Sequence, residues 1–163
     1  MPSGFGTAGA ADARLYLRES ELDQGARLLR AAWRNLRARA AEAAGDIDLT
    51  ESELDILIEL INLDNADVTT LRTQMNMPKQ SMTRHLQSLE DKALLVRKRC
   101  VRDGRRRLLA LTAEGARIAT RAAEGWRDAM SSAYMAAGPE DVASTRRLLA
   151  MLANAHDAGD KGG

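Results

Sequence analysis

Apolar residues near the start of this chain recur at alternating spacings of four and three, and this heptad pattern restricts the fold more than any other feature. The stripe consists of Leu22, Ala26, Leu29, Trp33, Leu36, Ala40 and Ala43. Such spacing places the apolar side chains on one face of a long helix. Ser20 followed by Asp23 resembles a capping box and predicts the helix start, and Gly45 predicts its end. Because no other long heptad helix lies nearby in the sequence, we expect this helix to pack against a second chain. The alternative is a core helix of a monomeric bundle.

Composition agrees with a mainly helical protein. The 163 residues include only two Trp, two Tyr and one Phe, and Ala is abundant. Ala has the highest helix propensity, whereas strands favour β-branched and aromatic residues. The length suits one domain, or a small domain with appended helices. We expect disordered tails at residues 1–14 and 158–163.

Several classes of protein are excluded by simple counts. One cysteine allows no internal disulfide, and two distant histidines offer no zinc spacing, so we expect no metal and no cofactor. No apolar run approaches the ~20 residues of a membrane span, and the N-terminus does not read as a signal peptide. We therefore expect a cytoplasmic protein without a membrane partner. A Gly-rich phosphate loop, a nucleophile elbow and a distinctive carboxylate pair are all missing, which argues against an enzyme.

The middle of the chain predicts three successive helices. Thr50 and Glu53 form a capping-box pattern that opens a helix over residues 51–62, with Leu54, Leu57, Ile58 and Ile61 on one face. Thr69 is the expected N-cap of a short helix ending near Met75, and Pro78 is expected at the first position of the next helix. That third helix is expected to bury Met82, Leu86, Leu89 and Ala93.

After the third helix, the spacing of apolar residues is no longer helical. Residues 95–101 and 107–111 read as two strands joined around Asp103 and Gly104, a dipeptide typical of hairpins. Thr112 is the expected N-cap of a long helix, Gly138 and Pro139 interrupt the chain, and a last helix presents Val142, Leu149 and Leu152. The expected fold is mainly α with a small β wing: a winged helix-turn-helix flanked by N- and C-terminal dimerisation helices.

The charge is unevenly distributed, although the formal net charge is only +1. Residues 78–107 hold ten basic and three acidic residues, a formal charge of +7, and the remainder carries −6. A charge run is usually a solvated face. Here it coincides with the helix pair and the hairpin, so we infer a DNA-binding surface in which the helix enters the major groove and the hairpin lies along phosphates or the minor groove.

The stretch from Val68 to Gly115 resembles the multiple antibiotic resistance regulator (MarR) family of winged-helix transcription factors. The residues that carry the resemblance are Leu49-Thr50, Ser81-Met82-Thr83-Arg84, Leu89-Glu90, Asp103-Gly104-Arg105 and Leu111-Thr112-Ala113-Glu114-Gly115. With the flanking helices, the resemblance covers roughly residues 15–157. Two departures are Ala93, where the family commonly has Gly, and a wing about one residue shorter than in many members.

The resemblance implies a symmetric dimer. Residues 15–48 would form the N-terminal dimerisation helix, residues 49–112 the winged-helix region, and residues 113–157 the C-terminal dimerisation helices. Contacts between subunits would involve Leu22, Leu29, Trp33, Leu149 and Leu152.

The same resemblance assigns the DNA contacts. The major groove would be contacted by Lys79, Gln80, Ser81, Thr83 and Arg84, and the wing would contribute Arg102, Asp103, Arg105 and Arg106. Asp103 would orient Arg105 through charge-assisted hydrogen bonds, the alternative for Asp103 being turn chemistry alone.

Many members bind small phenolic or otherwise anionic molecules, which shift the spacing of the recognition helices. Arg30, Trp33 and Leu54 are the candidates to line such an effector pocket, although core or dimer packing is the alternative for Trp33. Cys100 lies on the wing and is interpreted as inert, despite basic neighbours that could lower its pKa.

These observations predict a dimeric, sequence-specific DNA-binding transcriptional regulator, a repressor released from a pseudo-palindromic operator by a small effector. The alternative is a protein-binding helical dimer, or antirepressor, that has lost operator recognition.

Overall fold

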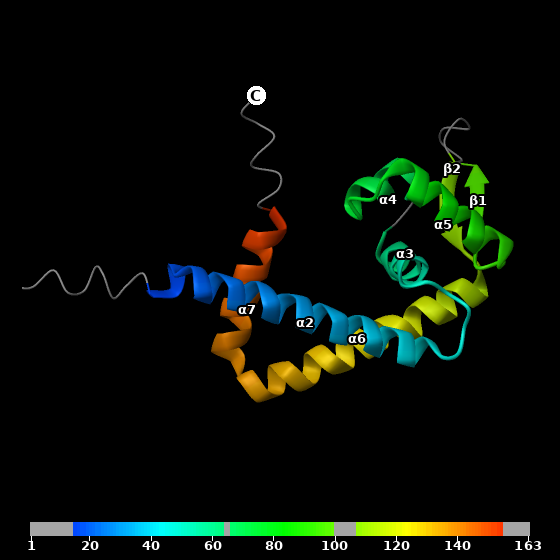
Figure 1. Ribbon diagram of the computed structural model, residues 1–163. Helices are drawn as coiled ribbons and strands as arrows, with labels where there is room; N and C mark the ends of the chain where they lie inside the picture. Colours follow the sequence, from blue (N-terminus) through cyan, green and yellow to red (C-terminus); the bar gives the residue numbers. More distant parts are fainter. Residues whose placement is uncertain (1–14, 64–65, 100–106, 155–163) are drawn as a thin grey trace, which may run out of the picture. The chain divides into compact units, whose positions relative to one another are not determined.

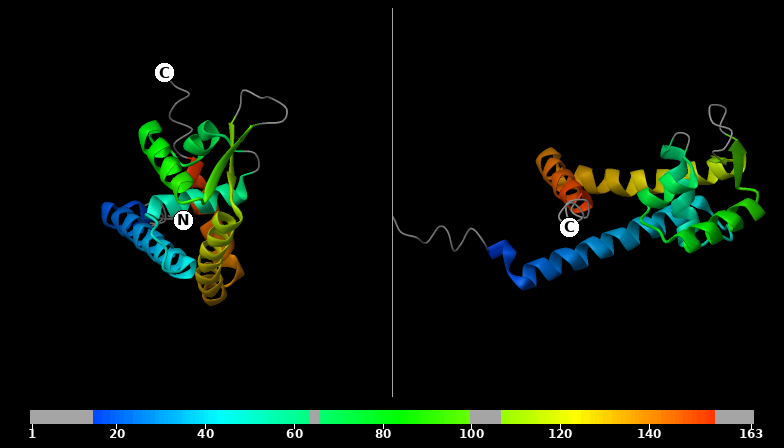
Figure 2. Two further views of the ribbon diagram at one scale, coloured as in Figure 1. Left: turned by 90° about the vertical axis from the view of Figure 1, so that its right-hand side faces the viewer. Right: turned by 90° about the horizontal axis from the view of Figure 1, so that it is seen from above.

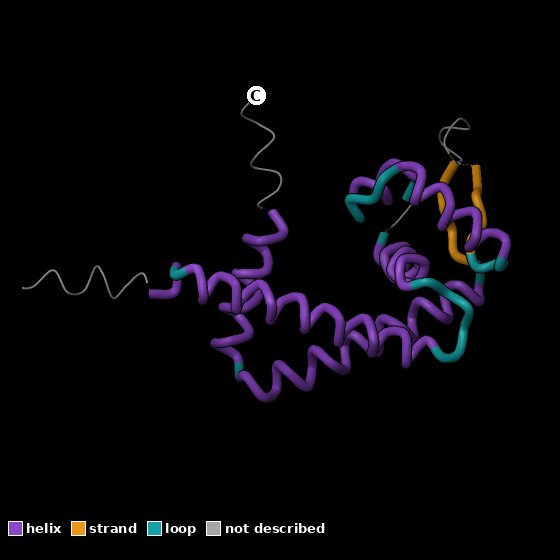
Figure 3. Tube along the Cα trace, in the orientation of Figure 1, coloured by secondary structure: helices purple, strands orange, loops and turns teal. Residues whose placement is uncertain are grey.

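The computed structural model describes residues 15–63, 66–99 and 107–154. This part of the chain contains six α-helices, a short 3-10 helix and one antiparallel pair of strands (Figure 1). The elements are η1 (Leu15–Leu17), α2 (Glu19–Ala44), α3 (Glu51–Asn62), α4 (Val68–Gln74), α5 (Lys79–Asp91), β1 (Leu95–Arg99), β2 (Arg107–Leu111), α6 (Ala113–Ala137) and α7 (Pro139–Asn154). Strand structure within the described residues is confined to this single hairpin (Figure 3). The predicted fold class, mainly α with a small β wing, is confirmed.

The chain divides into two compact units, residues 1–38 and 39–163. In the first unit, η1 precedes α2, and none of the described side chains is buried. The predicted helix start was wrong: α2 begins at Glu19, so Ser20 lies inside the helix. The carbonyl of Arg18 accepts from the N–H groups of Glu21 and Leu22, so the 3-10 turn leads directly into the helix without a side-chain cap at Ser20. The predicted stop at Gly45 is confirmed, with φ of 95° there.

Helix α3 lies at the centre of the second unit. Its N-terminus has the predicted capping box, in which the Thr50 hydroxyl accepts from the Glu53 N–H and the Glu53 carboxylate accepts from the Thr50 N–H. Ile56, Leu57 and Ile58 are completely buried, and the helix contacts α4, α5, α6 and β2. Because successive positions are buried, α3 is covered on more sides than the single predicted face.

The second and third helices of this unit are α4, which begins two residues earlier than predicted, and α5, which begins one residue later. Asp67, not Thr69, is the N-cap of α4, since its carboxylate accepts from both the N–H and the hydroxyl of Thr70 at 2.9 Å. Pro78 is the N-cap of α5 rather than its first residue, and Lys79 begins the helix. Neither shift changes the predicted burial of Met82, Leu86 and Leu89 in α5.

The end of α5 corrects another prediction. Met82, Leu86 and Leu89 are completely buried as predicted, but Ala93 is exposed and lies beyond the helix. Ala93 has φ of 56°, and its N–H donates to the carbonyl of Glu90. This left-handed residue reverses the chain direction, so that Leu94 takes the buried place instead.

The hairpin is joined to the helices at both ends. Its register pairs Leu95 with Leu111, and Leu109 donates from its N–H to the carbonyl of Ala66, which precedes α4. β2 leads directly into α6 (Figure 2) through Thr112, the predicted N-cap, whose hydroxyl accepts from the Gly115 N–H. A side chain at Gly115 would place its Cβ 2.0 Å from the carbonyl oxygen of Leu94, so this close packing requires glycine.

Helix α6 packs on the core through small residues. Ala119 and Ala122 are completely buried, and at Gly125 a Cβ would come within 2.5 Å of the Arg39 carbonyl oxygen. Gly138, with φ of 85°, separates α6 from α7, which has no buried residue. None of the helices in the described ranges is long and apolar enough to span a membrane.

The backbone at Ala93 leads to a stability prediction. A left-handed residue with a Cβ is strained by about 1 kcal/mol, so Ala93→Gly is expected to stabilise the protein by about that amount. Urea denaturation at one fixed protein concentration measures the change. Ala133→Gly, the same substitution at an exposed position inside α6, is the control and should cost about 0.5–1 kcal/mol. Destabilisation by both substitutions would contradict the assigned conformation.

Candidate nucleic-acid interface

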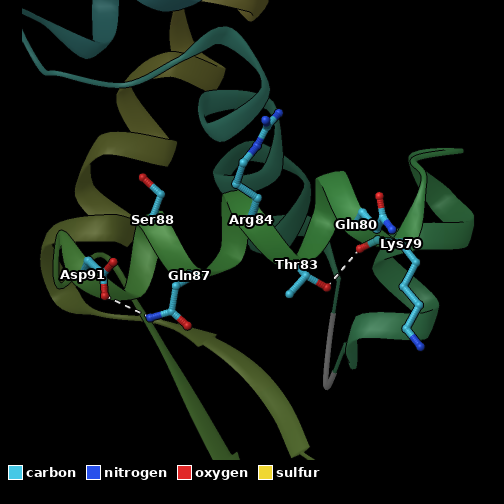
Figure 4. A pocket seen from close by; sticks show the side chains of 7 residues that line it. All are labelled: Lys79, Gln80, Thr83, Arg84, Gln87, Ser88 and Asp91. Atoms are coloured by element: carbon cyan, nitrogen blue, oxygen red, sulfur yellow. Dashed lines mark hydrogen bonds between the residues drawn. The ribbon is translucent and has the colours of Figure 1, made fainter.

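Helix α5 has two different faces. One face carries the completely buried Met82, Leu86 and Leu89, which contact the core. The opposite face is polar and borders an open surface hollow of about 780 Å³ (Figure 4). The lining consists of Lys79, Gln80, Thr83, Arg84, Gln87, Ser88 and Asp91. Because the buried face fixes the rotation of α5 about its axis, it also fixes which polar side chains are presented outward.

Four of the five residues predicted for the major groove lie on this face. Lys79, Gln80, Thr83 and Arg84 are exposed and line the hollow, whereas Ser81 is half-buried and is not among its lining residues. The Thr83 hydroxyl donates to the carbonyl of Lys79 at 2.9 Å, which leaves its oxygen as an acceptor. In Figure 4, Arg84 and Ser88 extend from one side of the helix, and Thr83 and Gln87 from the other.

Gln87, Ser88 and Asp91 also line the hollow, although they were not among the predicted site residues. The sequence contains a signal for Gln87 and Asp91. Positions 80, 84, 87 and 91 repeat at spacings of four, three and four, which places them on one face of a helix. The Gln87 amide nitrogen donates to the Asp91 carboxylate at 2.9 Å. Ser88 is half-buried beside α3 and has a structural role described next.

A buried carboxylate holds the end of α5 against the start of α3. Glu53 is only 2% exposed, and its Oε2 lies 3.1 Å from the Nζ of Lys92, the C-cap of α5. The same Nζ donates to the Asp48 carbonyl at 2.6 Å. Glu53 also accepts from the Ser88 hydroxyl. This network joins the segment before α3 to two positions of α5 and thereby restricts the orientation of the polar face.

The pKa of Glu53 reflects this network. Burial raises the pKa, but hydrogen bonds from Ser88, the Thr50 backbone, Lys92 and the Thr50 side chain outweigh burial and lower it to about 2. Glu53 is therefore ionised in the folded protein at neutral pH. Its charge is balanced by Lys92, as a buried carboxylate requires.

The base of the wing is basic and is attached to α5. The Arg97 Nε donates to the Glu90 Oε1 at 2.9 Å, which joins β1 to α5. Arg99 and Arg107 are exposed and lie directly opposite each other in the hairpin. Like charges in this position destabilise a strand pair, so an anion bound between them would relieve the repulsion. The predicted wing residues Arg102, Asp103, Arg105 and Arg106, together with Cys100, lie outside the described residues.

The predicted effector-pocket residues have different surroundings. Arg30 lines a surface hollow of about 480 Å³ on α2, together with Gln24, Arg27, Leu28, Ala31 and Arg34. Trp33 is 44% exposed, and the guanidinium of Arg37 lies 5.8 Å from the centroid of its ring. Leu54 is 7% exposed and belongs to the hydrophobic core. No cluster of His, Cys, Asp or Glu suited to a metal ion occurs in the described ranges.

This arrangement can recognise a polyanion that also carries directional hydrogen-bonding groups. Lys79 and Arg84 on α5 supply positive charge and donors, and Gln80, Gln87 and Asp91 supply donors and acceptors at regular spacing. A second basic group lies at Lys98, Arg99 and Arg107 of the hairpin. Double-stranded DNA combines phosphates with base edges in a groove about 12 Å wide, which fits a helix.

Comparison with known proteins agrees with this chemistry. The sequence profile of the MarR family matches residues 47–106. The HTH-type transcriptional regulator PetP of Rhodobacter capsulatus is 42% identical over 82 residues, which make up 50% of this chain and 49% of PetP. The chain therefore aligns with about half the length of that curated relative.

Solved structures share the fold at low sequence identity. The MepR–DNA complex of S. aureus has a TM-score of 0.66 at 17% identity, covering 80% of this chain and 96% of MepR. The PcaV transcriptional regulator of Streptomyces coelicolor, solved in complex with its natural ligand, has a TM-score of 0.63 at 22% identity, covering 87% of this chain and 96% of PcaV.

The Glu53 network predicts an acid-dependent loss of stability. Because folding lowers the pKa of Glu53 from 4.5 to about 2, its contribution is present above about pH 4.5 and is lost as the pH falls towards 2. Glu53→Gln should cost about 2 kcal/mol at pH 7, and less at pH 3. Urea denaturation at pH 7, 5 and 3 measures both effects. A cost independent of pH would contradict the assignment, and Glu124→Gln at an exposed site on α6 is the control.

Proposed function

We propose that the protein is a dimeric, sequence-specific DNA-binding transcriptional regulator of the MarR family, whose sequence profile matches residues 47–106. The observation that carries the proposal is the polar face of α5, which the burial of Met82, Leu86 and Leu89 holds toward solvent. We further propose that the protein is a repressor, released from a pseudo-palindromic operator when it binds a small molecule.

Each subunit would insert α5 into the major groove. Lys79, Gln80, Ser81, Thr83 and Arg84 are the proposed DNA-contacting residues of this helix, and the polar face of α5 adds Gln87. Arg and Gln can make paired hydrogen bonds to base edges, while Lys and Thr suit phosphates. Arg102, Asp103, Arg105 and Arg106 are proposed to act at the wing, adjacent to the basic pair Arg99 and Arg107.

Exposed apolar residues support dimerisation. On α2, Leu22, Leu29 and Trp33 are exposed. On α7, which has no buried residue, Leu149 and Leu152 are exposed in the single chain. Large exposed apolar side chains that gather on a helix indicate an interaction surface. We propose that residues 15–48 and 113–157 form the dimerisation region, and residues 49–112 the DNA-binding region.

A small anionic or phenolic effector is the proposed signal. Three arginines, Arg27, Arg30 and Arg34, line the hollow on α2, and guanidinium groups pair well with carboxylates. The ligand complex of PcaV, a protein with the same fold, supports effector binding as a mode of control. Arg30, Trp33 and Leu54 remain the proposed pocket residues, of which Leu54 is the least accessible.

The alternative function is that of an antirepressor, a helical dimer that binds protein rather than an operator. The exposed residues of α7 would serve it equally well. The paired arginines of the hairpin favour DNA, because they gain from a polyanion and not from an apolar partner. A regulator that acts on DNA is proposed to work in the cytoplasm, and we propose no enzymatic activity.

Binding to DNA should depend steeply on salt. Neutralised phosphates release counterions, so the logarithm of affinity should fall linearly with the logarithm of salt concentration. Arg105→Ala should weaken binding to all sequences, whereas Gln80→Ala or Arg84→Ala should relax preference at particular base pairs. Footprinting and fluorescence anisotropy on the DNA flanking the gene measure these effects. Equal losses on operator and random DNA in every variant would reject base recognition by α5.

Dimerisation should depend on α7. Leu152 is 52% exposed in the single chain, so Leu152→Glu should leave the fold intact and place a charge in the proposed interface. We expect monomers by sedimentation and a loss of operator affinity of at least tenfold. Ala150→Glu adds the same charge to a different face of α7 and is the control. A Leu152→Glu protein that remains dimeric would exclude this face from the interface.

A further inference from the structure

We propose that Asp91 fixes the amide of Gln87 so that the recognition helix selects an amino base, adenine or cytosine, over a keto base, guanine or thymine, at one operator position. This inference rests on the proposed DNA-binding function and adds a specificity-determining pair to it. Both side chains are exposed and line the polar face of α5.

The hydrogen bond between the two side chains determines the orientation of the amide. A carboxylate accepts hydrogen bonds and has no proton to donate at neutral pH, so the atom of Gln87 that faces Asp91 must be the amide nitrogen. The Gln87 Nε2 lies 2.9 Å from the Asp91 Oδ1. The amide oxygen then points away from Asp91, as Figure 4 shows. A glutamine without such a partner can rotate its amide and offer either group.

The outward oxygen is an acceptor, and it can be satisfied in the major groove only by an exocyclic amino group. Adenine presents its N6 amino group there and cytosine its N4 amino group, whereas guanine O6 and thymine O4 are themselves acceptors. Two acceptors facing each other repel. The Asp91 carboxylate, on the same face, adds a negative charge that further disfavours keto oxygens.

The position of Asp91 favours this role over ordinary helix stabilisation. A Gln–Asp pair four residues apart stabilises a helix slightly. However, Asp91 is the last residue of α5, where a carboxylate interacts unfavourably with the helix dipole, and it occupies a surface proposed to meet phosphates. The base selectivity that Asp91 provides explains why an acidic residue occupies the last position of α5.

The two ends of the polar face therefore differ. Lys79 and Arg84 provide donors toward the N-terminal end, and Gln87 and Asp91 provide acceptors toward the C-terminal end. Donors suit guanine, whose O6 and N7 both accept, and acceptors suit amino bases. Because donors lie at one end of this face and acceptors at the other, the face can match a DNA half-site in only one orientation.

The test begins with the full-length protein and selection from random double-stranded DNA. Affinities are then measured for all four bases at each position of the selected half-site. We expect one position at which A or C on one strand binds at least about fivefold better than G or T. In Asp91→Ala and in Gln87→Ala the preference at this position should disappear. The double variant should lose no more than either single variant, because the two residues act as one unit.

Gln80→Ala is the matched control, since Gln80 lies on the same face and, among the described contacts, it is Gln87 and not Gln80 that donates to Asp91. It should alter a different position and leave the amino-base preference intact. Asp91→Ala should melt at nearly the wild-type temperature, because Asp91 is exposed.

An unchanged base profile in Asp91→Ala, with a pseudo-palindrome selected by the wild type, would overturn the inference and leave the proposed function standing. A preference for G or T at the position that Gln87→Ala affects would also overturn it. If the wild type selects no sequence at all, both the inference and the proposed function fail.

Discussion

Burial of one face of α5 is the constraint on which the candidate site depends. Met82, Leu86 and Leu89 are completely enclosed, and each contributes roughly 1.5–3 kcal/mol when removed from water. Rotating α5 about its axis would expose these side chains and bury charged ones. The identity of the outward residues is therefore a consequence of the core.

Polar contacts then set the remaining degrees of freedom. Glu53 joins the start of α3 to Ser88 and Lys92, and the Arg97–Glu90 ion pair joins the hairpin to α5. The buried carboxylate is the more consequential of the two, because removing one partner would leave a charge in a low-dielectric environment. The ion pair at Glu90 is partly exposed and is correspondingly weaker. Helix and wing are thus positioned by the same end of α5.

Much of this arrangement was predictable from sequence, and the errors have identifiable physical causes. Helix α3, strand β2 and the Thr112 cap followed from periodicity and capping chemistry, which are local. The N-cap of α4 was assigned to Thr69, because Asp and Thr both suit an N-cap, and the structure selects Asp67, two residues earlier. Ala93 was assigned to the core because periodicity was extended past the helix end, where a left-handed turn redirects the chain.

The sequence by itself determined the fold class, the polarised charge and the polar character of α5, because these depend on residue order alone. The tertiary structure decided which polar residues act together. The hydrogen bond from Gln87 to Asp91 depends on side-chain orientation, and the burial of Glu53 depends on the packing of α3 against α5. Residues brought together across 39 positions, as Glu53 and Lys92 are, leave no periodic signal in the sequence, because only the folded chain makes them neighbours.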